Sequence, residues 1–173
     1  MGPVLAFRHA TEADLPTLVA LRDSAARRLM SAGIEQWRPG ELTEDQFRHH
    51  MRVGEVWVAT DGPDGRVVGA WELWWEDERT WGPRPPLAGY IHRLMIDHEN
   101  AWRGMGRAML TAAEDRIVAV GRGLARLDCA AHNPRLRRYY TDAGYTEVGH
   151  QPLHGPSGYP VTLFEKSLLR VHG

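Results

Sequence analysis

The sequence contains a single cysteine, Cys129, among its 173 residues. One thiol excludes an internal disulfide framework and any metal site built from several thiolates. Long hydrophobic runs are also missing, because no stretch approaches the ~18 uninterrupted apolar residues that favour a membrane-spanning helix. The N-terminal segment MGPVLAFRHATEADL carries charges where a signal peptide needs its apolar region. We therefore expect a soluble, cytoplasmic protein with no membrane partner.

An excess of charge of one sign is lacking as well. The net charge is −1 and the isoelectric point is near 6.8, which excludes a bulk attraction to nucleic acid. The distribution is uneven, since residues 35–99 carry seven Arg against thirteen acids and residues 100–173 carry ten basic against six acidic side chains. This pattern suits a protein that binds one cationic and one anionic group, although a solvated charged surface produces it too.

The composition indicates one globular domain over residues 1–173, with 43% hydrophobic and 25% charged residues. No internal repeat or low-complexity linker divides the chain. Glycine and proline predict loops at 33–41, 76–86 and 150–160. Hydrophobic periodicity predicts helices that begin at Thr11 and that span 43–50, 103–120 and 134–143. It predicts strands at 4–8, 55–60, 67–75, 88–96, 124–131, 146–149 and 161–166.

This order predicts an α/β fold with a mixed, mostly antiparallel sheet and flanking helices. The turn DGPDGR between the second and third predicted strands favours an antiparallel hairpin. The strand, helix and strand over 88–131 form a central crossover, which must be right-handed. Such a crossover places the N-terminus of its helix beside the carboxyl end of a strand.

The strongest chemical signal lies at the start of that crossover helix, in the turn Arg103-Gly104-Met105-Gly106-Arg107. The first turn of a helix offers unpaired backbone N–H groups at the positive end of the helix dipole, where phosphate binds. A glycine here lets the ligand approach the backbone closely. The turn therefore predicts a phosphate or pyrophosphate site, while two glycines in an ordinary helix start are the plain alternative.

A dinucleotide-binding unit is a rival interpretation of the same turn. Asp128 follows Gly106 by 22 residues, about where a ribose-binding acid belongs. Two features disfavour the rival. Met109 stands in place of the third glycine of that motif, and seven residues separate Ile96 from Gly104 where a dinucleotide turn follows its strand at once.

The runs LMIDHENAWRGMGRAML and RLDCAAHNPRLRRYYTDAGY resemble the acetyl-CoA-binding core of the GNAT family of N-acetyltransferases. The family's acceptor turn corresponds to 101–106, and its second motif to Asn133, Tyr140, Gly144 and Tyr145. The resemblance implies a GNAT-like single domain with its cofactor-binding core at about 88–148. The chain departs from the family pattern at Ala101, where Gln or Arg is usual, so one side-chain contact to the cofactor is absent.

The resemblance implies acetyl-CoA as cosubstrate and assigns its contacts. The backbone of β-strand residues 94–96 would pair with the pantetheine arm, and the N–H of Leu94 would face the thioester carbonyl. The turn would hold the pyrophosphate, and Asn133 would hold the cofactor arm. The implied cofactor-binding residues are Leu94, Met95, Ile96, Ala101, Trp102, Arg103, Gly104, Met105, Gly106, Arg107, Asn133 and Tyr140.

The resemblance also assigns catalytic roles. Tyr140 would be the general acid that protonates the departing thiolate, since a phenol keeps its proton at neutral pH. An amine acceptor must lose a proton before it attacks, and His92 is the preferred base because of the ordinary pKa of histidine. Glu72, Asp128 and a water relay stay open as alternatives.

The acceptor side is less specific. Trp37, Glu72, Trp74 and Asp128 are the predicted substrate-binding residues, because an aromatic wall with carboxylates suits an organic cation. We expect direct transfer of an acetyl group to a primary amine of a small molecule. A protein N-terminus or lysine as acceptor, and a non-catalytic CoA-binding module, are the alternatives. No metal is expected, since His92, His98 and Glu99 lack a convergent ligand spacing, and a homodimer is left open.

Overall fold

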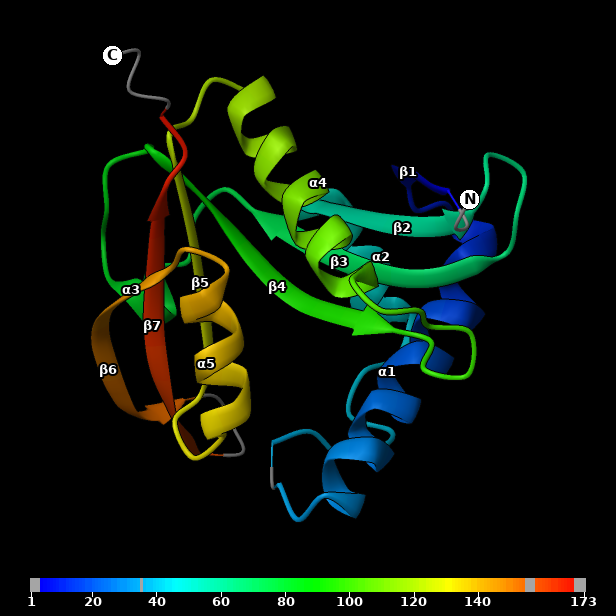
Figure 1. Ribbon diagram of the computed structural model, residues 1–173, viewed down its shortest axis with the longest axis horizontal. Coiled ribbons are helices and arrows are strands. Elements are labelled where there is room, and N and C mark those ends of the chain that lie inside the picture. The colour runs from blue at the N-terminus through cyan, green and yellow to red at the C-terminus, as the bar shows by residue number, and fades with distance from the viewer. Residues whose placement is uncertain (1–3, 35, 155–157, 170–173) are drawn as a thin grey trace. The chain divides into compact units, whose positions relative to one another are not determined.

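The computed structural model describes residues 4–34, 36–154 and 158–169 (Figure 1). Strands and helices follow one another in the predicted order, with one short helix added. No helix in these ranges is both long and apolar enough to cross a membrane. In chain order the elements are β1 (Leu5–His9), η1 (Glu12–Asp14), α1 (Leu15–Ser31), α2 (Glu44–Val53), β2 (Glu55–Asp61), β3 (Val67–Trp74), α3 (Glu78–Trp81), β4 (Ala88–Ile96), α4 (Met105–Ala119), β5 (Leu124–Ala130), α5 (Pro134–Asp142), β6 (Thr146–His154) and β7 (Tyr159–Ser167).

The seven strands have the order β1-β2-β3-β4-β5-β7-β6. The pairs β1 with β2, β2 with β3, β5 with β7 and β6 with β7 are antiparallel, whereas β4 and β5 are parallel. Parallel neighbours need a long crossover connection, and the segment that contains α4 supplies it. The predicted mixed, mostly antiparallel α/β fold is confirmed, and so is the hairpin of β2 and β3.

The chain divides by its packing into two compact units. Unit 1 comprises Met1–Leu73 and Arg93–Ala113, and unit 2 comprises Trp74–His92 and Glu114–Gly173. In unit 1, α1 contacts α2 and α2 contacts β2. Leu18 of α1, Phe47 of α2 and Val58 of β2 are fully buried members of one core cluster. This core forms because each helix turns its apolar stripe, spaced at three and four residues, toward the strands.

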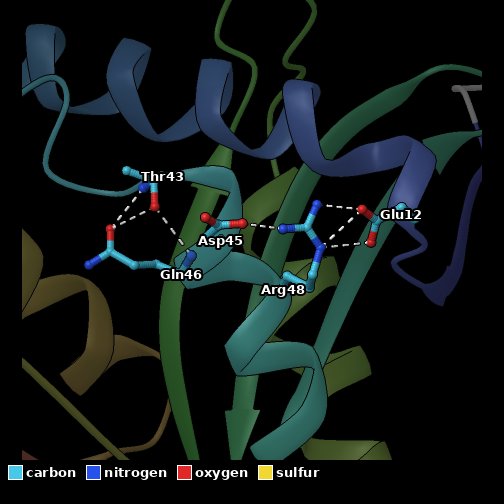
Figure 2. Close-up of polar contacts among 5 residues, drawn as sticks. All are labelled: Glu12, Thr43, Asp45, Gln46 and Arg48. Carbon is cyan, nitrogen blue, oxygen red and sulfur yellow. Dashed lines mark hydrogen bonds and ion pairs between the residues drawn. The ribbon is translucent and has the colours of Figure 1, made fainter.

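The N-terminus of α2 in unit 1 is held by side chains (Figure 2). The Thr43 Oγ1 accepts from the Gln46 N–H at 3.3 Å, and the Gln46 Oε1 accepts from the Thr43 N–H at 2.8 Å. Arg48, one turn along, binds both Asp45 and Glu12 of η1. The reciprocal pair satisfies backbone donors that the first helical turn leaves open, so Thr43 sets where α2 begins.

Unit 2 is built on β5, β7 and β6. Its core cluster includes Trp81, Tyr90 and Leu163, and α5 packs onto β7 through the rings of Tyr140 and Phe164, whose centroids are 5.8 Å apart. The predicted end of α5 is confirmed, since Gly144 has a φ of +96° and the Tyr145 N–H donates to the Tyr140 carbonyl at 3.0 Å. Glycine suits this left-handed position because it has no Cβ.

Two predicted loops contain regular structure. Within the predicted loop 76–86, Asp77 caps α3 by accepting from the Thr80 N–H, and Thr80 and Trp81 are buried. A four-residue helix is too short for periodicity to reveal. Within the predicted loop 150–160, β6 continues through His154 and β7 begins at Tyr159. The prediction was wrong there because pairing with β7 extends β6 past Pro152, while residues 155–157 lie outside the described ranges.

Replacing Thr43 by Ala should lower the free energy of unfolding by about 1 kcal/mol, because the Gln46 N–H loses its acceptor. For a protein of this size that corresponds to about 2–4 °C in Tm. Thermal unfolding followed by circular dichroism measures the change. Thr43→Ser keeps the hydroxyl and is the matched control, so equal Tm values for the two variants would contradict the cap.

Candidate active site

The loop before α4 contains the glycines of the predicted phosphate turn, whose binding role stays a prediction. Gly104 has a φ of +89°, and a Cβ built on it would meet no atom within 4 Å. The first helical hydrogen bond of α4 runs from the Ala108 N–H to the Gly104 carbonyl at 3.0 Å. Gly106 lies in the turn before that bond, where N–H groups have no acceptor within the helix. Met105 is buried, while Arg103 is exposed.

The preceding loop is braced by Asp97. Its carboxylate accepts from the Glu99 N–H at 3.1 Å and from the Asn100 Nδ2 at 2.6 Å, and its backbone N–H donates to the Val68 carbonyl at 2.8 Å. Ala101 is exposed, and the Trp102 carbonyl accepts from the Met105 N–H at 3.2 Å. These bonds fix the path of the chain from β4 into α4. The N-terminus of α4 is therefore held in place by contacts within unit 1.

Strand β4 carries a kink at Arg93. Its φ of +49° is the sole positive value for a non-glycine residue within the described ranges. A left-handed residue inside a strand costs free energy and changes the direction of the chain that follows it. Met95 points into the core at 1% exposed, whereas Leu94 and Ile96 are half-buried. Leu94, Met95 and Ile96 directly follow this kink.

Glu72 holds the kinked residue. Its side chain is fully buried, and the Arg93 Nη1 donates to both carboxylate oxygens at 3.2 Å. The His50 Nδ1 lies 3.1 Å from the Glu72 Oε1. A buried carboxylate needs such partners. The predicted roles of Glu72 toward substrate stay predictions, and its carboxylate already bridges α2 and the kink within unit 1.

Trp37 is also placed in unit 1. It packs at the edge of the core cluster, and the Arg22 guanidinium lies 4.1 Å from its ring centroid. Arg22 is itself buried and forms an ion pair with Glu41 at 3.0 Å. The indole is therefore fixed by a cation already present in the chain.

In unit 2, β4 and β5 separate early. The two parallel strands pair only where Ala88–Tyr90 of β4 lies beside Leu124–Arg126 of β5. On its other edge β5 pairs with β7 along its whole length. Within the described part of unit 2, the edge of β5 that faces β4 therefore has no strand partner after Arg126. Leu127, Cys129 and Ala130 are buried there, so backbone groups on that edge need a partner other than a neighbouring strand.

His92 lies on β4 beyond the last paired residue. Its Nε2 is 3.0 Å from the Asp77 Oδ2, and its ring centroid is 3.8 Å from that of Trp74. Asp128 of β5 completes a group in which one ligand atom from each of Asp77, His92 and Asp128 lies within 4.8 Å of the others. This group can hold a cation, including a metal ion or an ammonium, or it can move a proton.

Burial raises the pKa of Asp77, but the contact with His92 and the bonds from Thr80 outweigh it and hold the pKa of Asp77 below its ordinary value. Asp77 is therefore ionised at neutral pH although its side chain is 3% exposed. Asp77, His50 and Arg93 are not among the site residues predicted from the sequence. A capping signal, Asp77 three residues before Thr80, was present, but nothing in the sequence indicates its contact with His92.

Tyr140 and Asn133 both lie on α5. Tyr140 is 9% exposed, and its ring packs against those of Tyr139, Tyr145 and Phe164. Burial is the main cause that raises the pKa of Tyr140, and Cys129, Tyr139 and Asp128 add to it. Asn133 is buried, and its Oδ1 caps α5 by accepting from the Leu136 N–H at 3.1 Å.

Comparison with known proteins identifies the family. The model of the acetyltransferase (GNAT) family matches residues 19–145. An uncharacterized N-acetyltransferase, YesJ of Bacillus subtilis, is 35% identical over 79 residues, which are 46% of this chain and 41% of the relative. The mycothiol acetyltransferase of Beutenbergia cavernae is 29% identical over 128 residues, which are 70% of this chain and 39% of the relative. The chain thus spans about two fifths of the length of these relatives.

Solved structures of acetyltransferases share the fold of this chain. YncA of Salmonella typhimurium, described as a putative acetyltransferase with its cofactor acetyl-CoA, superposes with a TM-score of 0.69 at 15% identity, over 98% of this chain and 96% of that one. The turn at Gly104, the kink at Arg93 and the early separation of β4 from β5 lie within the matched residues. The chain belongs to the GNAT acetyltransferase family.

Proposed function

We propose that the protein transfers the acetyl group of acetyl-CoA directly to a primary amine of a small molecule. The observation that carries the proposal is the head of α4, where Gly104 has a φ of +89° and open space around its Cβ position. A helix head of this kind binds phosphate through backbone N–H groups and the helix dipole. Acetyl-CoA combines a pyrophosphate with an activated acetyl group, and YncA was solved with it.

The residues of unit 1 fit this cosubstrate. The turn from Ala101 to Arg107 would hold the pyrophosphate, with Arg103 exposed beside it. The backbone of Leu94, Met95 and Ile96, which follows the kink at Arg93, would pair with the pantetheine arm. The N–H of Leu94 would face the thioester carbonyl, and a donor in that position is worth about 10² to 10³ in rate. The missing side chain at Ala101 leaves these backbone contacts intact.

Tyr140 is the proposed general acid, supported by its environment in unit 2. A phenol is protonated at neutral pH, and burial raises the pKa of Tyr140 further, so the protonated form that a general acid needs is the form present. Asn133 would hold the cofactor arm through its amide Nδ2, because its Oδ1 is engaged by the Leu136 N–H.

His92 is the proposed base that accepts the proton of the amine. It is half-buried and in contact with an ionised carboxylate, Asp77. A water relay stays open beside it. Glu72 is the weaker candidate for this role, since Arg93 and His50 already occupy its carboxylate.

Direct transfer is favoured over an acetyl-cysteine route by the state of Cys129. Burial is the largest cause that raises the pKa of the Cys129 thiol, to about 12, and the neighbouring Asp128 adds to it. A thiol in this state is a weak nucleophile at neutral pH because the thiolate is the reactive form.

A small-molecule amine is the proposed acceptor because the candidate group in unit 2 combines two carboxylates, Asp77 and Asp128, with the Trp74 ring. Carboxylates and an indole face suit an organic ammonium. One relative is named for a small molecule, mycothiol. Protein N-termini or lysines as acceptors would need an open groove. The cytoplasmic location, the single domain over 1–173 and a homodimer stay predictions.

Acetyl-CoA should bind with a calorimetric 1:1 stoichiometry and should raise Tm, whereas NAD(P) should not. Thiol release from acetyl-CoA should then rise with one class among polyamines, aminoglycosides, amino acids and peptides.

Gly104→Val should abolish binding of acetyl-CoA, because a side chain there keeps the pyrophosphate from the backbone. Gly121→Val is the matched control, since Gly121 shares the φ of +89° and open surroundings. Binding retained by Gly104→Val would contradict the phosphate turn.

Replacing Tyr140 by Phe should lower kcat by about 10² or more, because the sulfur then leaves without an acid. The affinity for acetyl-CoA should change little, since the ring stays in place. Steady-state thiol release gives kcat, and calorimetry gives the affinity. Tyr139→Phe is the control for the loss of a phenol at the adjacent position of α5. Unchanged turnover in Tyr140→Phe would remove it as the acid.

Cys129 in the folded protein should resist iodoacetamide at pH 8.5, because with a pKa of about 12 about one thiol in 10³ or fewer is ionised there. The raised pKa means that the alkylation rate should grow about tenfold per pH unit until the protein unfolds. Mass spectrometry after a timed reaction measures the modified fraction. The same chain in denaturant is the control and should react fully. Rapid, complete alkylation of the folded chain would contradict this prediction.

A further inference from the structure

We propose that Asp77 is a positioning residue for His92, which it holds as the tautomer with the proton on Nε2, so that Nδ1 carries the lone pair that accepts the amine proton. This inference rests on the proposed function, because only an acetyl transfer to an amine gives that lone pair a proton to accept. The tautomer itself is a property of the folded chain. It can therefore be measured whether or not the protein is an acetyltransferase.

The contact between Asp77 and His92 is tied to the N-terminal cap of α3 in unit 2. Asp77 is the residue before α3, and its side chain is 3% exposed. Its Oδ1 accepts from the Thr80 N–H, so its Oδ2 is directed away from the helix and lies 3.0 Å from the His92 Nε2. The cap thus fixes the orientation of the carboxylate plane, and the carboxylate in turn fixes the imidazole.

Trp74 restricts the imidazole from a second side. The two ring centroids are 3.8 Å apart, with 31° between the planes. A ring held both by an indole face and by a carboxylate has little freedom to flip. An ionised carboxylate oxygen 3.0 Å from Nε2 repels a lone pair there and attracts a proton, so the neutral imidazole carries its proton on Nε2. Nδ1 is then the basic atom.

Other roles for this group make different predictions. A metal ion on Asp77, His92 and Asp128 requires Nε2 to be a ligand without a proton. A simple ion pair with no part in proton transfer leaves turnover independent of which nitrogen carries the proton. The protonation of Nε2 therefore separates the metal site from the positioning role, and the dependence of turnover on the tautomer separates the simple ion pair from it.

A substitution at Asp77 can change the contact with His92 and leave the cap of α3 in place. Asparagine caps helices as well as aspartate does, so in Asp77→Asn the Oδ1 keeps the Thr80 N–H and α3 stays capped. Its Nδ2 then occupies the place of the Oδ2 that faces His92. An amide N–H forces Nε2 to accept, which moves the imidazole proton to Nδ1. Asp77→Ser keeps a capping oxygen but is too short to reach His92.

Nitrogen-15 histidine spectra of the full-length protein at pH 8.5 read the tautomer directly, and His92→Gln assigns the signal. We expect the Nε2–H form in the unmodified chain, the Nδ1–H form in Asp77→Asn and a mixture in Asp77→Ser. An Nδ1–H form in the unmodified chain, or no change in Asp77→Asn, would overturn the proposal. One equivalent of added Zn²⁺ binding at the His92 Nε2 would also overturn it in favour of a metal site.

Kinetics test the consequence. Asp77→Asn should lower kcat by about 10² or more with the KM for acetyl-CoA unchanged, and Asp77→Ser should lower it less. In a His92→Gln background, Asp77→Asn should cause no further loss, because the two residues act as a unit. Additive losses would refute a role through His92. If no acceptor is turned over, the proposed function fails while the nitrogen spectra still decide the tautomer.

Discussion

The separation of β4 from β5 is the constraint on which the rest of unit 2 depends. The two parallel strands pair for three residues each, and β5 then continues with a partner on one edge only. A parallel pair cannot be joined by a tight turn, so its connection carries α4. His92 and Asp128 both follow the last paired residues, and with Asp77 they form a group whose ligand atoms lie within 4.8 Å of one another.

Buried carboxylates organise both units in the same way. Glu72 in unit 1 and Asp77 in unit 2 are each almost fully buried, and each meets a histidine. An uncompensated charge in such a position would be costly, so each site is viable only as a set. In unit 1 the set includes Arg93 and stabilises a left-handed residue in β4. In unit 2 the set includes the cap of α3 and orients an imidazole.

Local signals in the sequence predicted most of the elements. β4 was predicted with the bounds that the structure has, and the ends of α4 and α5 followed from Gly121 and Gly144, which adopt positive φ. The failures have one cause. Both missed elements are short and depend on tertiary contacts. α3 is stabilised by the burial of Trp81. The extension of β6 is stabilised by the pairing of Gln151 with β7. Such tertiary contacts leave no periodicity in the sequence.

The sequence by itself determined the family, the fold class and the turn at Gly104, because glycine position, helix caps and motif spacing act over a few residues and need no distant partner. Tertiary structure alone decided that Arg93 would be kinked over Glu72 and that Asp77 would meet His92. These pairs join residues 21 and 15 positions apart, on different elements. Their contact depends on strand register and on the direction of a cap, which the order of residues does not encode locally.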